Sequence, residues 1–212
     1  MIIADGEAIS LSKLQELATD KTVMVLDGAY HQIHDTGMRI DYLLGDFDSI
    51  TPELLKAARD QGTEVIHTPD QDFTDLEKAI QYCQNNDMQE IDIAAATGLR
   101  LDHTLYNLRL LKRFHGKCAQ LSLVTEIEKI VFLKDESVSL SVKDKQPLAL
   151  MAFPKAVVTS SGLEYDMDRY LLAFAESEST SNSIVASEAV IDVDGEALLI
   201  MSHETDNKRL YV

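Results

Sequence analysis

The sequence predicts an α/β fold over residues 1–128, followed by an antiparallel β-sandwich over residues 129–212. In the first part, short β-type runs alternate with helical stretches, a pattern typical of a mostly parallel sheet. After residue 128 the helical patterns stop, and short apolar runs separated by polar turns replace them. A chain of 212 residues is long enough for these two domains, each with a core of its own.

Each element of the first part has a local signal. The expected strands are residues 2–4, 22–26, 42–44, 64–67, 90–95 and 120–125. The expected helices between them are residues 11–18, 52–61, 75–85 and 102–114. Two helix starts carry cap residues: Thr51 precedes Pro52, and Thr74 opens a capping box that ends at Glu77.

The second part reads as strands and turns. Two short strands, residues 130–133 and 138–142, are expected to flank a polar turn. Residues 148–153 and 157–159 follow as further strands, and the Ser/Thr/Glu-rich residues 176–183 read as a loop. Asp194–Gly195, between residues 190–193 and 197–201, is the strongest short hairpin signal in the chain.

Charge and apolar content limit the possible partners. The net charge of −17 disfavours nucleic acid and anionic lipid, and a nucleotide bound to such a surface would need metal ions to mediate the contact. The longest apolar run, residues 148–153, is too short to span a bilayer, and Asp5 comes too early for a signal peptide. We therefore expect a cytoplasmic protein in which Cys83 and Cys118 are reduced structural thiols.

Polar clusters directly follow four of the expected strands. In a parallel sheet the loops after the strands emerge at the same carboxyl-terminal edge, where open α/β folds bind ligands. The clusters are Asp27–Gly28 and residues 45–49, 70–75 and 97–103. Their convergence predicts a binding site more strongly than any one of them does.

The cluster at residues 45–49 suggests a metal site. Asp46 and Asp48 alternate around Phe47, so in an extended segment both carboxylates would point the same way. Mg²⁺ prefers oxygen ligands, usually one or two carboxylates completed by phosphate oxygens and water. A simple helix start explains Thr51 and Pro52 but not the two aspartates before them.

The cluster at residues 70–75 has two interpretations. Asp75 would favour a helix N-terminus through the helix dipole alone, and Asp70 and Asp72 are ordinary turn residues. A ligand role is equally compatible with the composition. These aspartates would lie close to a second acidic loop, and like charges repel unless a cation sits among them.

The last cluster supplies positive charge. Arg100, beside Gly98 at a strand-to-helix turn, could hold phosphate oxygens together with free helix N–H groups. The alternative is a weak surface ion pair of Arg100 with Asp102 or Asp75. His103 reads more readily as a packed or capping histidine than as a base, and Asp27–Gly28 alone could be an ordinary turn.

Together these segments resemble a known family. Residues 45–49 (GDFDS), 70–75 (DQDFTD) and 100–103 (RLDH) resemble, in order and spacing, the signature segments of thiamine pyrophosphokinases. Residues 161–165 (SGLEY) and Ser181–Asn182 are similar to that family's two C-terminal segments. The resemblance implies an α/β nucleotide- and Mg²⁺-binding domain (1–128), a β-sandwich thiamine-binding domain (129–212), and a homodimer with active sites between subunits.

The resemblance also implies a reaction and a set of site residues. The thiamine hydroxyl would attack the β-phosphorus of ATP with the help of Mg²⁺, and AMP would leave. Expected catalytic residues are Asp46, Asp48, Asp75 and Asp102, of which Asp46, Asp48 and Asp75 would also bind the metal. Expected ATP and phosphate contacts are Asp27, Gly28, Arg100, Asp102 and His103, and expected thiamine contacts are Gln71, Tyr165, Ser181 and Asn182.

Some alternatives stay open at this point. Ala29 and Leu99 depart from the family's pattern of glycines, and each would add a side chain where backbone approaches a ligand. A diphosphokinase of the same fold could act on another primary alcohol, such as a hydroxymethylpterin. A thiamine-binding module without catalysis is the other alternative, although it would not need the acidic residues.

Overall fold

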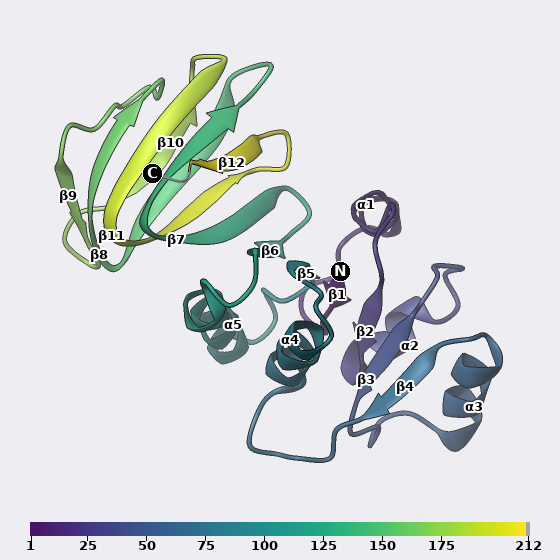
Figure 1. Cartoon of the computed structure of the whole chain (residues 1–212). Helices are drawn as coiled ribbons and strands as arrows, with labels where there is room; N and C mark the ends of the chain where they lie inside the picture. Colours follow the sequence, from purple (N-terminus) through teal and green to yellow (C-terminus); the bar gives the residue numbers. More distant parts are fainter. Residues whose placement is uncertain (211–212) are drawn as a thin grey trace. The chain divides into compact units, whose positions relative to one another are not determined.

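The computed structural model describes residues 1–210, which form two compact units, 1–126 and 127 onward. Strands in the first unit pair in parallel, and strands in the second unit pair antiparallel (Figure 1). The parallel sheet of the first unit and the antiparallel sheet of the second confirm the predicted fold class. Within residues 1–210, no helix is both long and apolar enough to cross a membrane.

The first unit is a parallel sheet with strand order β6-β5-β1-β2-β3-β4. Its strands are β1 (Ile2–Ile3), β2 (Met24–Leu26), β3 (Tyr42–Gly45), β4 (Glu64–His67), β5 (Glu90–Ala94) and β6 (Gln120–Val124). Its helices are α1 (Leu11–Leu17), α2 (Asp27–Ile33), α3 (Pro52–Asp60), α4 (Asp75–Asn85) and α5 (Leu101–Phe114). The chain runs outward from β1 to β4 and then returns to β5 on the other side of β1, so the strand order reverses at β1.

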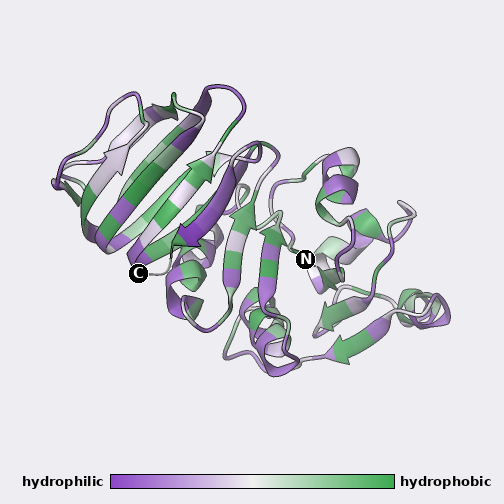
Figure 2. Cartoon of the chain, turned by 45° about the horizontal axis from the view of Figure 1, so that its top comes forward, coloured by the Kyte–Doolittle hydropathy of each residue, from purple (hydrophilic) through white to green (hydrophobic). Residues whose placement is uncertain are grey.

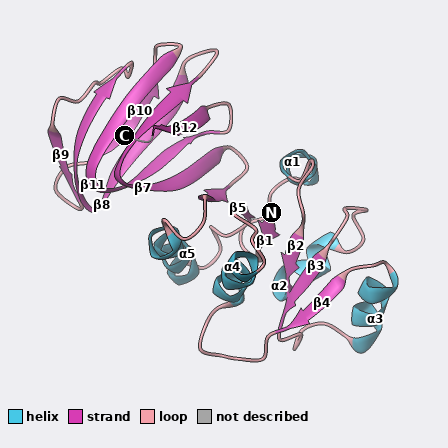
Figure 3. Cartoon of the chain, in the orientation of Figure 1, coloured by secondary structure: helices cyan, strands magenta, loops and turns pink. Residues whose placement is uncertain are grey.

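Helices lie on both faces of this sheet (Figures 1 and 3). Ile3, Val25 and Leu43 are register partners, and they share one core with buried residues of α1, α2 and α3. Alternate strand residues such as Ile2 and Ile93 are equally buried and point to the opposite face, as expected from the period of two in a strand. The buried residues of α4 and α5 complete the apolar interior, and apolar colour is concentrated in the strands (Figure 2).

Most element bounds in this unit agree with the sequence prediction, because caps and strand ends are local signals. Thr51 and Thr74 accept hydrogen bonds from the backbone N–H groups of Leu54 and Glu77, each at 3.3 Å. The helix α2 was not predicted. It begins directly after β2 with Asp27 and Gly28, which read as a turn in the sequence because glycine is a poor helix former.

The second unit is antiparallel, with strand order β10-β8-β11-β7; β12 pairs with β7 and β9 pairs with β8. Its strands are β7 (Glu128–Ser141), β8 (Gln146–Ser161), β9 (Tyr170–Ala173), β10 (Ser179–Ile184), β11 (Glu188–Ser202) and β12 (Asp206–Leu210). Buried side chains from both ends of β7, β8 and β11 belong to one core, consistent with a sandwich formed by long bent strands.

The predicted turns inside this unit are wrong. Asp194–Gly195 is not a hairpin: β11 continues through it, and the register shifts there against both β7 and β8. The polar residues 134–137 likewise lie within the single strand β7. The Gly195 N–H donates to the Asp135 carboxylate at 2.8 Å, so the two irregular points are bonded to each other. Between Val193 and Glu196, β11 has one residue more than the facing part of β7, a bulge that bends this long strand.

Two further predictions in the second unit need correction. Residues 148–153 and 157–159 belong to one strand, β8, rather than two. The Ser/Thr/Glu-rich segment at 176–183 is a loop only in its first part, because β10 begins at Ser179. Its polar side chains are compatible with a strand at the side of the sheet, where β10 pairs with β8.

Candidate functional site

A cavity of about 400 Å³ opens at the carboxyl-terminal edge of the parallel sheet. It is lined by residues that follow β1, β2 and β5, together with the first residues of α4 and α5. These strands meet where the strand order reverses, which is the position at which open α/β sheets bind ligands. The cavity brings together the predicted residues Gly28, Asp75, Arg100 and His103.

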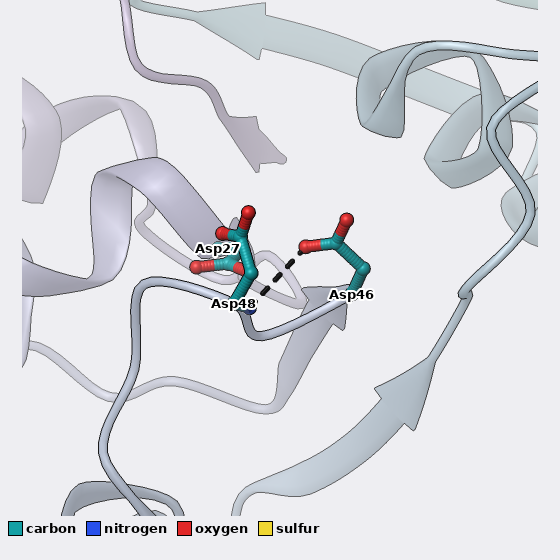
Figure 4. A group of neighbouring side chains, drawn as sticks. All are labelled: Asp27, Asp46 and Asp48. Atoms are coloured by element: carbon teal, nitrogen blue, oxygen red, sulfur yellow. Dashed lines mark hydrogen bonds between the residues drawn. The ribbon is translucent and has the colours of Figure 1, made fainter.

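Three aspartates form an acidic group at the same edge, which we call the acidic triad: Asp27, Asp46 and Asp48 (Figure 4). Each offers a carboxylate oxygen, and these oxygens all lie within 4.8 Å of one another. Oxygen donors at this spacing fit a hard cation such as Mg²⁺. The prediction from the sequence paired Asp46 and Asp48 with Asp75 instead, and assigned Asp27 to the phosphates.

Asp27 is the most enclosed member of the acidic triad, with only 3% of its surface exposed. Its Oδ2 accepts a hydrogen bond from the Phe47 N–H at 2.5 Å, and its Oδ1 accepts one from the Ser49 hydroxyl at 2.6 Å. Burial raises the pKa of Asp27, and the two hydrogen bonds oppose that rise. The negative charges of Asp46 and Asp48 raise it further, so a bound cation would relieve a repulsion built into the site.

The two aspartates around Phe47 come together by a different geometry from the one predicted. Phe47 has φ of 62°, a left-handed conformation, so residues 46–48 are not an extended segment. The Asp48 N–H donates to the Asp46 carboxylate at 3.3 Å, which closes this turn (Figure 4). The Phe47 ring stacks on His67, with 5.7 Å between ring centroids. Non-glycine residues at positive φ are costly and concentrate at functional sites.

Glycines at this edge make room for carboxylates. A side chain added at Gly45 would collide with the side chain of Asp27, so only glycine fits beside the buried acid. A Cβ at Gly28 would lie 2.7 Å from the Asp5 carboxylate, which the Gln32 amide holds at 3.0 Å. Close approach therefore explains both glycines, but the group that approaches is an acidic side chain of the protein itself.

The loop at residues 70–75 contacts the acidic triad through Gln71. The Gln71 amide donates to Asp46 Oδ2 at 2.9 Å, and this bond is the largest cause of the lowered pKa of Asp46. Asp70 accepts from the Asp72 N–H at 2.8 Å, which agrees with the turn interpretation of these two residues. Gln71, predicted to contact thiamine, is thus placed beside the predicted metal ligands.

Asp75 is held by a lysine that the sequence analysis missed. The Lys78 ammonium pairs with Asp75 Oδ1 at 3.1 Å and donates to the Thr68 carbonyl at 2.9 Å, and its side chain is largely buried. Its charge also contributes to the lowered pKa of Asp46. Its position one helical turn after Asp75, on the same face of α4, was the signal available in the sequence.

Arg100 and Asp102 form the surface ion pair that was the alternative to phosphate binding. The guanidinium is bidentate, with Nε to Oδ1 at 3.1 Å and NH2 to Oδ2 at 2.6 Å. This contact lowers the pKa of Asp102 to about 2. The pair is exposed, so it contributes little to stability, and Arg100 can exchange a carboxylate for a phosphate.

The two departures from the family pattern have different consequences. The Ala29 methyl is buried in the core of the first unit, so it leaves backbone approach at Gly28 unchanged. Leu99 has φ of 52° and is 80% exposed, and it lines the cavity beside Arg100. It holds a glycine-like backbone conformation with a large apolar side chain at the cavity wall.

The predicted thiamine residues of the second unit surround one loop. Asn182 is buried, and its amide both accepts from the Tyr165 N–H at 3.1 Å and donates to the Tyr165 carbonyl at 2.9 Å. Its side chain therefore holds the loop that carries Tyr165, whose own side chain is 66% exposed. Ser181 is exposed at φ of 59°, where the register of β10 shifts.

Comparison with known proteins identifies the chain's relatives. Residues 14–123 match the family model described as thiamin pyrophosphokinase, catalytic domain, and residues 136–198 match its vitamin B1 binding domain. Thiamin pyrophosphokinase 1 of Caenorhabditis elegans is 26% identical over 219 residues, covering 96% of this chain and 88% of the relative.

Solved structures have the same fold. The crystal structure of thiamine pyrophosphokinase from Bacillus subtilis has a TM-score of 0.81 at 19% identity, covering 95% of this chain and 97% of that one. The thiamin pyrophosphokinase family protein from Enterococcus faecalis has a TM-score of 0.80 at 25% identity, with coverage of 95% and 97%. The catalytic-domain match alone spans more than half of the sequence, and the chain belongs to the thiamin pyrophosphokinase family.

Proposed function

We propose that this chain transfers the diphosphate of ATP to the hydroxyl of thiamine, giving thiamine diphosphate and AMP. The observation that carries the proposal is the acidic triad at the carboxyl-terminal edge of the parallel sheet, in a chain that matches both domains of the family. Diphosphate transfer requires positioning and charge neutralisation rather than covalent catalysis by the protein, and this edge offers groups for both.

The acidic triad would hold Mg²⁺. Asp27, Asp46 and Asp48 fit the ion because all three offer carboxylate oxygens close together. When bound, the ion would neutralise negative charge on the transferred phosphates. Asp75, which the resemblance assigns to the metal, forms an ion pair with Lys78. It directly follows the loop whose Gln71 contacts the triad, and we propose that it helps to bind the metal and phosphates from there.

Arg100 would bind the phosphates. It would exchange the bidentate contact with Asp102 for phosphate oxygens when ATP enters the cavity. His103 and Gly28 line the same cavity and would contact the nucleotide. Acceptance of the hydroxyl proton would fall to a carboxylate, either Asp102 once Arg100 has left it or a member of the acidic triad.

The second unit would recognise thiamine. The exposed Tyr165 ring offers a cation–π contact to the thiazolium, and Asn182 would keep the Tyr165 loop in place. Ser181 and Gln71 would hydrogen-bond the aminopyrimidine. We further propose a homodimer with active sites at the subunit interface, as the resemblance implies. The free, buried Cys83 and Cys118 are consistent with work in a reducing compartment such as the cytoplasm.

One assay tests the reaction. Purified protein with ATP and Mg²⁺ is offered thiamine or a hydroxymethylpterin, and AMP release is followed. AMP formed only with thiamine supports the proposal, whereas AMP formed only with the pterin would indicate the other diphosphokinase. Thiamine binding without AMP from any alcohol would indicate a non-catalytic module.

A further inference from the structure

Glu77 is a carboxylate fully buried in the first unit, with 0% of its surface exposed. The sequence places it at the third position of a capping box, where its side chain would return to the backbone N–H of Thr74. The structure keeps the Thr74 half of this motif, whereas the Glu77 carboxylate points inward and bonds to side chains. A charge buried this deeply is rare and costly unless it is paired.

The partners of Glu77 come mainly from α5. Its Oε2 accepts from the Tyr106 hydroxyl at 2.5 Å and from Arg113 NH1 at 3.3 Å. Its Oε1 pairs with Arg113 NH2 at 3.0 Å and accepts from the Gln81 amide at 3.3 Å. The first turn of α4 is thereby tied to the middle and end of α5.

Arg113 extends this contact to the loop that precedes α4. Its guanidinium carbon lies 5.6 Å from the centroid of the Phe73 ring, a cation–π geometry. Phe73 lies directly before Thr74, which caps α4. Two residues before Phe73 is Gln71, which donates a hydrogen bond to Asp46 of the acidic triad. A continuous series of contacts therefore joins buried Glu77 to the triad through Arg113 and the loop.

We propose that Glu77 and Arg113 are positioning residues of the acidic site. The buried carboxylate fixes the guanidinium, the guanidinium holds the Phe73 ring, and the loop then presents Gln71 to the triad. This inference rests on the proposed function, because it concerns the same metal and phosphate site. The alternative is that Glu77 and Arg113 only hold α4 against α5, and that the contact of Arg113 with Phe73 has no effect on the acidic site.

Substitutions at Phe73 separate these two roles, since its ring is partly exposed and lies outside the helices. Phe73→Leu keeps apolar bulk but removes the π face, and Phe73→Trp restores a π face for the guanidinium. The measurements are hydrogen exchange of the amides at residues 70–75, the Mg²⁺ dependence of turnover, and the unfolding temperature.

We expect Phe73→Leu to speed loop exchange and raise the half-saturating Mg²⁺ by roughly two- to fivefold, the size of one partly exposed cation–π contact. The kcat at saturating Mg²⁺ and the unfolding temperature stay near the wild-type values, because the α4–α5 contacts are untouched. Phe73→Trp returns both quantities toward wild type. In a protein that already carries Arg113→Gln, Phe73→Leu causes no further change in loop exchange, because the two residues act through one contact.

Three outcomes would overturn the inference. Phe73→Leu could leave loop exchange and Mg²⁺ dependence unchanged, it could lower only the unfolding temperature, or its effect on loop exchange could add to that of Arg113→Gln. If the wild-type protein formed no AMP, the proposed function would fail, whereas the exchange comparison would still decide whether Arg113 orders the loop.

Discussion

The substitution Asp27→Asn tests the acidic triad by its effect on the stability of the protein rather than on turnover. The asparagine can keep both hydrogen bonds of Asp27: its carbonyl accepts from the Phe47 N–H, and its amide donates to the Ser49 hydroxyl oxygen. What is lost is the charge assistance of two bonds, about 1 kcal/mol each. What is gained is relief from a buried charge repelled by Asp46 and Asp48. Without Mg²⁺ we therefore expect the free energy of unfolding to change by about 1 kcal/mol or less.

The stabilisation by Mg²⁺ should differ between the wild-type protein and Asp27→Asn. An ion that binds only the folded state adds about 1.4 kcal/mol at ten times its dissociation constant. For a chain of this size, that corresponds to a rise in unfolding temperature of about 3–6 °C. The wild-type protein should show this rise, and Asp27→Asn, which lacks one carboxylate of the triad, should show less than half of it at the same Mg²⁺ concentration.

The assay is thermal unfolding across a Mg²⁺ titration at constant ionic strength. Asp168→Asn is the matched control, because it removes one exposed negative charge from the second unit and should respond to Mg²⁺ as the wild type does. If Asp27→Asn were stabilised by Mg²⁺ as much as the wild type, the ion would not bind at the triad.

Further predictions concern the cavity wall, the second unit and the core. Leu99→Gly should be neutral or stabilising by about 1 kcal/mol in thermal unfolding, whereas Leu99→Val should destabilise, because β-branched residues tolerate positive φ least. Asn182→Ala should cost roughly 1–3 kcal/mol in urea unfolding, since it removes two hydrogen bonds between the buried Asn182 amide and the partly buried backbone of Tyr165; an unchanged midpoint would show that Asn182 does not hold the Tyr165 loop. Burial raises the pKa of Cys83 to about 11, so at pH 8 only about one thiol in a thousand is ionised. Native Cys83 should therefore resist iodoacetamide at pH 8, become more reactive as the pH rises toward 11, and react readily in denaturant; rapid labelling of the native protein would refute this.

The parallel unit was predictable because its signals are local. The ends of α4 agree with the sequence prediction at both residues, since Thr74 caps its start and the apolar period runs to Asn85. Local signals predicted the strands of the second unit less well. Asp194–Gly195 has the sequence of a hairpin turn, but only the pairing of β11 with two neighbours reveals that the strand continues through it.

In the candidate site, too, some residues could be predicted from local signals, whereas others depend on contacts between distant residues. Asp46 and Asp48 were recognisable from their spacing, although the left-handed Phe47 brings them together by an unforeseen route. Asp27 resembles a turn residue in the sequence, and its place in the triad depends on burial beside Gly45, a contact between distant residues. The inward orientation of the Glu77 side chain could not be predicted either. The capping box predicts a bond to the nearby backbone, but the carboxylate bonds to Tyr106 and Arg113 of α5 instead.

The central claim is that the acidic triad carries diphosphate transfer to thiamine. Its most direct test is the rate of AMP release by Asp46→Asn at saturating ATP, Mg²⁺ and thiamine, with Asp168→Asn as the control. We predict that Asp46→Asn loses roughly a hundredfold or more in kcat, while its unfolding temperature without Mg²⁺ stays close to that of the wild type. Formation of thiamine diphosphate by Asp46→Asn at the wild-type rate would contradict the account.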